Sequence, residues 1–197
     1  MNDKTVEILR LFRQNGGYLR TSKLREANIH PYHLRKLVQQ GKVEKIRFGL
    51  YRLVDSGSDE MLTVQNAIPF GVFCMFSAWD FYHLTTYKPF EYHIAIDKSR
   101  KVTLPDYPPV KVYYWDSKVF RLGQTSAKVN DGEIKIYDIE RSVCDAVKFR
   151  NKIGKDIMLE VLKNYLHRRD RNLEKLLSYA DKLRIKKVLQ TYIETMQ

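Results

Sequence analysis

The chain has 197 residues, 44% hydrophobic and 29% charged, and these proportions exclude a disordered or fibrous protein. Its 35 Lys and Arg against 23 Asp and Glu give a formal net charge of +12, which favours an anionic partner, either nucleic acid or an anionic membrane surface. The two cysteines, Cys74 and Cys144, each lie in an apolar stretch. We therefore expect a reducing compartment rather than a disulfide scaffold.

The sequence shows neither a signal peptide nor a transmembrane segment. The N-terminus, Met-Asn-Asp-Lys-Thr-Val, has no apolar region. The most apolar run, residues 67–79, is broken by Pro69 and Gly71 and is too short to span a bilayer. The expected location is the cytoplasm, with no membrane partner.

The positive charge is concentrated at the two ends of the chain. Residues 1–55 carry +7 and residues 145–197 carry +6, whereas residues 56–144 carry −1. A basic end is commonly a solvated helix face, and we keep this interpretation for the last third. For the first 55 residues, the pattern of elements favours a specific anionic partner.

Residues 1–54 predict a small domain of short helices and strands. The first predicted helix is capped by Asp3 and ends at Gly16-Gly17, and a short strand follows at 18–19. A second helix over 22–27 is capped by Thr21, and a third runs from Pro31 to Gln40. Two strands, over 43–47 and 50–53, complete the segment. This order is typical of a winged helix-turn-helix domain.

The predicted helix from Pro31 has one apolar and one basic face. Leu34, Leu37 and Val38 cluster on one side and are expected in the core. No acidic residue lies between Pro31 and Gly41. The side chains expected to face DNA bases from the opposite side are Tyr32, His33, Arg35, Lys36 and Gln39.

Further cations and one serine on the neighbouring elements are candidate phosphate contacts. They lie on the predicted hairpin and at the start of the preceding helix, where winged-helix proteins approach the DNA backbone. The predicted set is Arg20, Ser22, Lys23, Lys45, Arg47 and Arg52. The competing interpretation is a basic helical domain that docks a protein partner.

A polar segment, residues 55–59, is the predicted linker to a second domain over 60–197. Its first part, 60–138, is expected to be rich in strands and to contain two helices. One helix is predicted over 61–68, and the other begins at Ser77, where Ser77 and Asp80 form a capping-box variant. The predicted strands are 71–76, 90–96, 110–115, 125–129 and 133–137, and Asn130-Asp131-Gly132 is a hairpin signal between the last two. The second part, 139–197, is expected to form a helical bundle, so that the whole chain is of the α+β class.

The predicted C-terminal helices carry three apolar stripes and one basic cluster. The stripes contain Met158, Val161, Leu162 and Tyr165; then Leu173, Leu176, Leu177, Ala180 and Leu183; then Ile185, Val188, Leu189, Tyr192, Ile193 and Met196. The basic cluster, a possible second contact for DNA or a protein, consists of Lys182, Arg184, Lys186 and Lys187.

The N-terminal segment resembles the winged-helix domain of AbiEi-type antitoxins. The runs that carry the resemblance begin at Gly16 (Gly-Gly-Tyr-Leu-Arg-Thr-Ser-Lys-Leu-Arg-Glu-Ala-Asn-Ile) and at Leu34 (Leu-Arg-Lys-Leu-Val-Gln-Gln-Gly-Lys-Val-Glu-Lys-Ile-Arg-Phe-Gly-Leu-Tyr-Arg-Leu). The Gly-Leu-Tyr at Gly49 is similar to the Gly-x-Tyr that closes the wing in such domains. Related domains occur on other regulators.

The second domain extends this resemblance. The run from Phe76 (Phe-Ser-Ala-Trp-Asp-Phe-Tyr-His-Leu-Thr) is similar to the Ser-Ala-x-x-x-x-His-x-Leu-Thr helix of these antitoxins, and that from Tyr137 (Tyr-Asp-Ile-Glu-Arg-Ser-Val-Cys-Asp) to their Glu-Arg-Thr/Ser-x-x-Asp segment. The resemblance implies a non-enzymatic, DNA-binding autorepressor of its own operon. It also implies a type IV (abortive-infection) toxin–antitoxin system, in which the second domain neutralises a nucleotidyltransferase-like toxin.

Two alternatives stay open. One is a winged-helix transcription factor without a toxin, whose second domain senses a ligand or dimerises. The other is a Mg²⁺-dependent restriction-type nuclease, because Asp106 followed by Glu133-Ile134-Lys135 has the order of that site. This motif is short and degenerate.

No cofactor or metal site is predicted. The five histidines show no metal-ligand spacing with the cysteines or with one another. His83 and Asp145, the latter near Arg141, are expected to be structural groups within the core.

Overall fold

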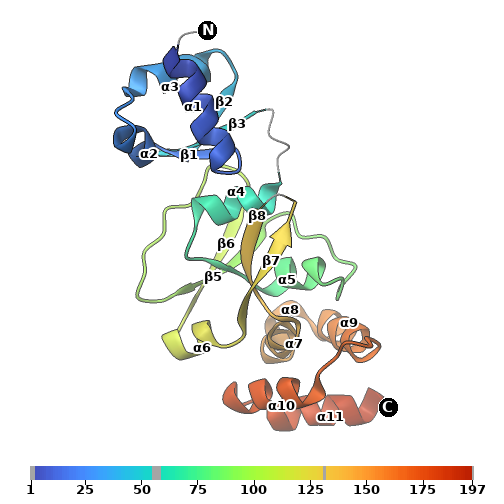
Figure 1. The fold of residues 1–197 in the computed structure, drawn as a ribbon. Coiled ribbons are helices and arrows are strands. Elements are labelled where there is room, and N and C mark those ends of the chain that lie inside the picture. Colours follow the sequence, from blue (N-terminus) through green and yellow to red (C-terminus); the bar gives the residue numbers. More distant parts are fainter. Residues whose placement is uncertain (1–2, 55–58, 131, 197) are drawn as a thin grey trace. The chain divides into compact units, whose positions relative to one another are not determined.

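A computed structural model of the chain describes residues 3–54, 59–130 and 132–196. Within these residues the fold is mixed α+β, with two separate sheets (Figure 1). The chain divides into two compact units: Met1–Pro69 with Val102–Pro109 and Lys128–Glu133, and Phe70–Lys101 with Val110–Ala127 and Ile134–Gln197.

The first unit contains the small N-terminal domain, residues 3–54, which we call the head (blue in Figure 1). Its elements follow the predicted order: α1 (Asp3–Gln14), β1 (Tyr18–Arg20), α2 (Thr21–Glu26), α3 (Pro31–Gln39), β2 (Val43–Arg47) and β3 (Leu50–Leu53). The strands form an antiparallel sheet in the order β1-β3-β2. Its buried core consists of Ile8, Phe12, Leu19, Leu24, Ile29, Leu34, Leu37 and Val43.

Both helix caps predicted for the head differ from the structure. Asp3 is the first residue of α1 instead of preceding it. Thr21 is likewise inside α2, which is preceded by Arg20 without a side-chain cap. The Thr21 amide donates instead to the carbonyl of Gly49 at 3.0 Å, and this bond ties the start of α2 to the β2–β3 turn. Gly49 has φ +76°, a conformation that glycine adopts without strain.

The first unit also contains α4 (Glu60–Ala67), which the sequence analysis assigned to the second domain. Residues 55–58 of the predicted linker lie outside the described residues. Asp59, the last residue of that linker, is the N-cap of α4 and accepts from the amides of Met61 (2.8 Å) and Leu62 (3.2 Å). The contacts therefore group α4 with the head.

The second sheet has the order β6-β5-β4-β8-β7. Its strands are β4 (Val72–Phe73), β5 (Tyr92–Asp97), β6 (Val110–Trp115), β7 (Gln124–Val129) and β8 (Gly132–Tyr137). β4 pairs antiparallel with β5 and parallel with β8, and β5 pairs parallel with β6. β7 and β8 are neighbours as the hairpin signal predicts; Asp131 of that signal lies outside the described residues.

Two helices in the second unit correct the sequence analysis. α5 (Met75–Phe81) begins two residues before the predicted Ser77 cap, which shortens the preceding strand. The Ser77 hydroxyl accepts from the amide of His93 at 2.8 Å, so it joins α5 to β5 instead of capping the helix. The short helix α6 (Ser117–Arg121) was not predicted.

The C-terminal helices are α7 (Ile139–Lys148), α8 (Arg150–Ile153), α9 (Lys155–Leu166), α10 (Leu173–Lys182) and α11 (Lys186–Met196). α7 contacts each of the others and α5 (Figure 1). Its residues from Glu140 to Val147 are buried. The predicted stripes supply the buried side chains that pack around it, among them Met158, Leu162, Leu176 and Leu189. In the described part of the chain, no helix has the length and apolar character needed to cross a membrane.

A buried ion pair lies inside the second unit. Arg141 and Asp145 are fully buried, and the Arg141 Nε donates to Asp145 Oδ1 at 3.1 Å. Arg141 Nη1 also donates to the carbonyls of Val119 and Leu122, and its guanidinium lies over the rings of Trp115 and Tyr137. Asp145 is thus a core residue as predicted. His83 is not, because it is exposed, with φ +56°, just after α5.

Candidate nucleic-acid interface

The helix α3 is fixed at both ends by local signals. Pro31 occupies its first turn, and the His30 ring accepts from the amide of Tyr32 at 3.2 Å. Gly41, with φ +68°, follows its C-terminal end. Because Leu34 and Leu37 are buried, the opposite face of the helix is directed away from the head's core.

The predicted base-facing residues lie on this outward face. Tyr32 is 60% exposed, and Arg35, Lys36 and Gln39 are also exposed. His33 is half-buried and makes an edge-to-face contact with the ring of Tyr32. The head therefore presents cations, an amide and an aromatic ring on a helix that carries no carboxylate.

The predicted phosphate contacts fall into two groups. Ser22, Lys23 and Lys45 are exposed on α2 and β2. Lys23 forms an exposed ion pair with Glu26 at 2.7 Å, which water screens strongly. These three side chains can reach an external anion without giving up a buried contact.

The second group contacts α4. Arg20 Nη2 donates to the carbonyl of Asn66 at 2.6 Å, and Arg47 Nε donates to that of Ala67 at 3.2 Å. Arg52 forms an ion pair with Glu44 and donates from Nη1 to the Thr63 hydroxyl at 3.2 Å. All three were predicted as phosphate contacts, and the sequence did not indicate their acceptors on α4, which lie 11 to 46 residues away along the chain.

Arg20 and Arg47 form a locally cationic pair. Their acceptors on α4 are main-chain carbonyls at its C-terminal end, which carry partial negative charge. Partial burial, followed by repulsion from Arg20, lowers the pKa of Arg47, yet a guanidinium stays charged at neutral pH. The positive charges of Arg20 and Arg47 are thus only partly neutralised by the carbonyls, so the two guanidiniums can also bind an anion.

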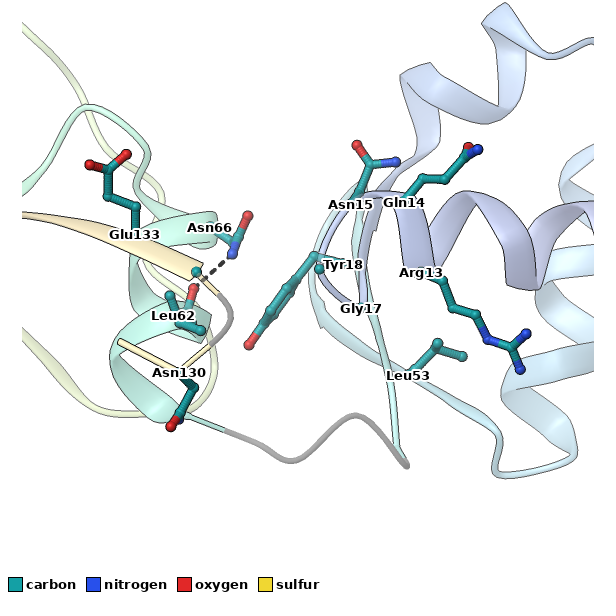
Figure 2. A pocket seen from close by; sticks show the side chains of 12 residues that line it. Arg13, Gln14, Asn15, Gly17, Tyr18, Leu53, Leu62, Asn66, Asn130 and Glu133 are labelled. Carbon is teal, nitrogen blue, oxygen red and sulfur yellow. Dashed lines mark hydrogen bonds between the residues drawn. The ribbon is translucent and has the colours of Figure 1, made fainter. Parts of the chain in front are cut away.

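A pocket of about 680 Å³ lies in the first unit between β1 and α4. Figure 2 shows Tyr18 projecting toward the side of the pocket that carries Leu62 and Asn66. The Tyr18 hydroxyl shares a hydrogen bond of 2.7 Å with that of Thr63. The other described lining residues are Arg13 and Glu133 together with amide, glycine and aliphatic groups.

The predicted C-terminal basic cluster lies at the junction of α10 and α11. Lys182, Arg184, Lys186 and Lys187 are all exposed, and Arg184 has φ +59° in the turn between the two helices. The structure thus brings these cations together on one connection of the second unit.

The candidate nuclease residues are exposed. Asp106 lies in a loop, whereas Glu133 and Lys135 belong to β8. Among residues 3–54, 59–130 and 132–196, no three or more His, Cys, Asp or Glu side chains form a group that could hold a metal ion.

The Tyr137-to-Asp145 motif mostly supplies structural contacts. Asp138 caps α7 and accepts from the Arg141 amide and the Tyr179 hydroxyl, both at 2.9 Å. Lys175 forms ion pairs with Asp138 (3.2 Å) and Glu140 (3.0 Å). This network, which the sequence analysis missed, joins α7 to α10.

The N-terminal segment matches a known protein family. Residues 6–54 match the family model described as a transcriptional regulator, AbiEi antitoxin, and this confirms the resemblance of the N-terminal segment. The matched segment spans α1 to β3 and contains α3 with its exposed basic face. No curated protein matches the chain.

Proposed function

We propose that the head is a winged helix-turn-helix domain that binds duplex DNA, with α3 as its recognition helix and the β2–β3 hairpin as its wing. The observation that carries this proposal is the outward, carboxylate-free face of α3, with Tyr32, Arg35, Lys36 and Gln39 exposed on it. The match to a transcriptional-regulator family over the same residues supports it.

The dimensions and chemistry of α3 suit the major groove. An α-helix with its side chains is about 10–12 Å across, and the major groove is about 12 Å wide. Arg35 and Lys36 can donate to guanine edges, and Gln39 can form paired hydrogen bonds with adenine. Tyr32 and His33, at the N-terminal end of α3, can contact bases or sugars beside them.

Phosphates are contacted, in this proposal, by the cations and one serine that flank α3. Ser22, Lys23 and Lys45 bind the backbone directly. Arg20 and Arg47 exchange a neutral carbonyl acceptor for an anionic phosphate, which is the stronger acceptor. Arg52 contributes mainly by charge, because Glu44 already holds it.

We further propose that the whole chain is a cytoplasmic, non-enzymatic autorepressor and antitoxin of a type IV system. In this proposal residues 60–197 neutralise a nucleotidyltransferase-like toxin encoded beside it. The family match at residues 6–54 supports the antitoxin assignment. The cluster at Lys182, Arg184, Lys186 and Lys187 provides a second contact for DNA or for the toxin.

The two parts of the proposal are tested separately. Titration of the full chain against the DNA upstream of its own gene, at several salt concentrations, tests DNA binding. Co-expression with the adjacent gene tests the antitoxin function: the chain should restore growth that the toxin alone arrests. Saturable DNA binding without a neighbouring toxin gene would favour a transcription factor that acts without a toxin.

A further inference from the structure

The tip of the β2–β3 hairpin carries an exposed aromatic ring that the proposed contact sets do not use. Phe48 is 86% exposed, more than any other large hydrophobic side chain in the described part of the chain. Of the two turn residues, Gly49 has the positive φ, +76°, and Phe48 does not. The position of Phe48 therefore accepts most residues, and the turn itself does not require a phenylalanine there.

The backbone that carries Phe48 is braced by its neighbours. Leu50 and Ile46 on either side of the turn are buried, and Gly49 accepts the bond from the Thr21 amide described above. A Cβ at Gly49 would lie 3.3 Å from the Thr21 hydroxyl, so α2 packs closely against the turn. Phe48 is thus presented by a braced turn, with little backbone entropy left to lose on binding.

The charges beside Phe48 indicate the kind of partner. Arg47 precedes it and donates from Nη1 to the Phe48 carbonyl at 3.5 Å. Arg20 and Arg47 donate to the carbonyls of the adjacent residues Asn66 and Ala67, so a second guanidinium lies nearby. Lys45 is exposed on the same strand as Arg47. An apolar ring among cations fits a polyanion with an apolar interior, which describes the stacked bases of DNA.

We propose that Phe48 is a wedge that enters the minor groove beside the site of α3 and partly unstacks one base step. Apolar side chains at such positions kink the duplex toward the major groove, and pyrimidine–purine steps deform most easily. The ring would thereby favour DNA sequences in which this base step deforms easily, although no hydrogen bond is made to the base edges there. This inference rests on the proposed DNA binding by the head.

The test uses the full chain and the tightest duplex that it selects from a random-sequence pool. Dyes at the two ends of the duplex report its bend, and 2-aminopurine at successive positions beside the α3 site reports unstacking. With the unmodified chain we expect a bend and a severalfold rise in 2-aminopurine fluorescence at one step. Phe48→Ala should remove both and weaken binding about tenfold, with an unchanged salt dependence because no phosphate contact is lost.

Two variants sharpen the result. Phe48→Leu keeps an apolar side chain and should restore part of the bend. Val6→Ala removes an exposed apolar side chain, 48% exposed on α1, and should change nothing. A bend and fluorescence signal that survive in Phe48→Ala, or binding of the unmodified chain without unstacking, would overturn the wedge while leaving DNA binding intact. If the unmodified chain selects no duplex, the proposed function itself fails.

Discussion

Arg47 donates a hydrogen bond from Nε to the carbonyl oxygen of Ala67 at 3.2 Å, which links the end of β2 to the C-terminal end of α4. Arg20 makes the corresponding bond to the carbonyl of Asn66. A phosphate that binds these guanidiniums must share them with α4 or displace it. The proposed binding of DNA by the head would therefore be coupled to its contact with α4 through the same two side chains.

Replacing Arg47 with alanine should weaken DNA binding and reduce its salt dependence. Loss of one phosphate contact lowers the slope of log affinity against log salt by about one. Arg10→Ala is the matched control, because Arg10 is exposed on α1 and lies outside the proposed contact sets. Equal slopes for Arg47→Ala and the unmodified chain would remove Arg47 from the phosphate set.

Breaking the buried ion pair should destabilise the second unit. Asp145→Ala leaves the Arg141 guanidinium buried without its carboxylate, a change that typically costs about 3–5 kcal/mol. Urea denaturation measures the free energy of unfolding. Glu7→Ala, which removes an exposed pair with Lys4, should cost less than about 1 kcal/mol. Similar losses in the two variants would contradict the account of the core.

Gly123 lies directly against this ion pair and should not tolerate a side chain. A Cβ there would be 2.6 Å from the Cβ of Arg141, and Gly123 has φ +76°. Gly154 also has a positive φ, +93°, but a Cβ there meets no atom within 4 Å. Gly154→Ala should therefore cost about 1–3 kcal/mol of backbone strain, and Gly123→Ala about 1–3 kcal/mol more because of the close contact. Thermal unfolding of the two variants checks this difference.

The second unit should lose stability in mild acid because of His93. Burial lowers the pKa of His93 to about 4; Glu91 raises it and Lys111 lowers it further. In the unfolded chain His93 takes up a proton near pH 6.5, whereas in the folded chain it does so only near pH 4. The free energy of unfolding is therefore at its full value above pH 6.5 and falls as the pH drops to about 4. The loss from this group is about 3 kcal/mol. His93→Gln should flatten this part of the stability profile; an identical pH profile in the variant would contradict the buried, neutral state of His93.

Local signals predict the head well and its contacts poorly. The strands β2 and β3 match the predicted spans, and α3 ends one residue early, because Pro31, Gly41 and alternating apolar residues act within a few positions. The acceptors of Arg20 and Arg47 lie on α4, and no pattern near either arginine indicates them. The sequence thus predicts a cationic face, whereas the tertiary packing decides which cations are already engaged.

The second unit shows the same division. The apolar stripes on α9, α10 and α11 predict its buried side chains. Ser77 carries a helix-cap signal, but its hydroxyl accepts from His93 on β5, a partner that depends on the packing of α5 against the sheet. The burial of Arg141 depends on carbonyls of Val119 and Leu122 in a helical segment that the sequence analysis did not predict.

The most direct test of the account is the affinity of the full chain for its upstream DNA when the exposed face of α3 is changed. Lys36→Ala and Gln39→Ala remove side chains that make no buried contact, so the fold should be unaffected. Each should weaken specific binding by about 1–3 kcal/mol and relax the sequence preference at one position. Unchanged affinity and preference in the doubly substituted chain would contradict the assignment of α3 as the DNA-reading element.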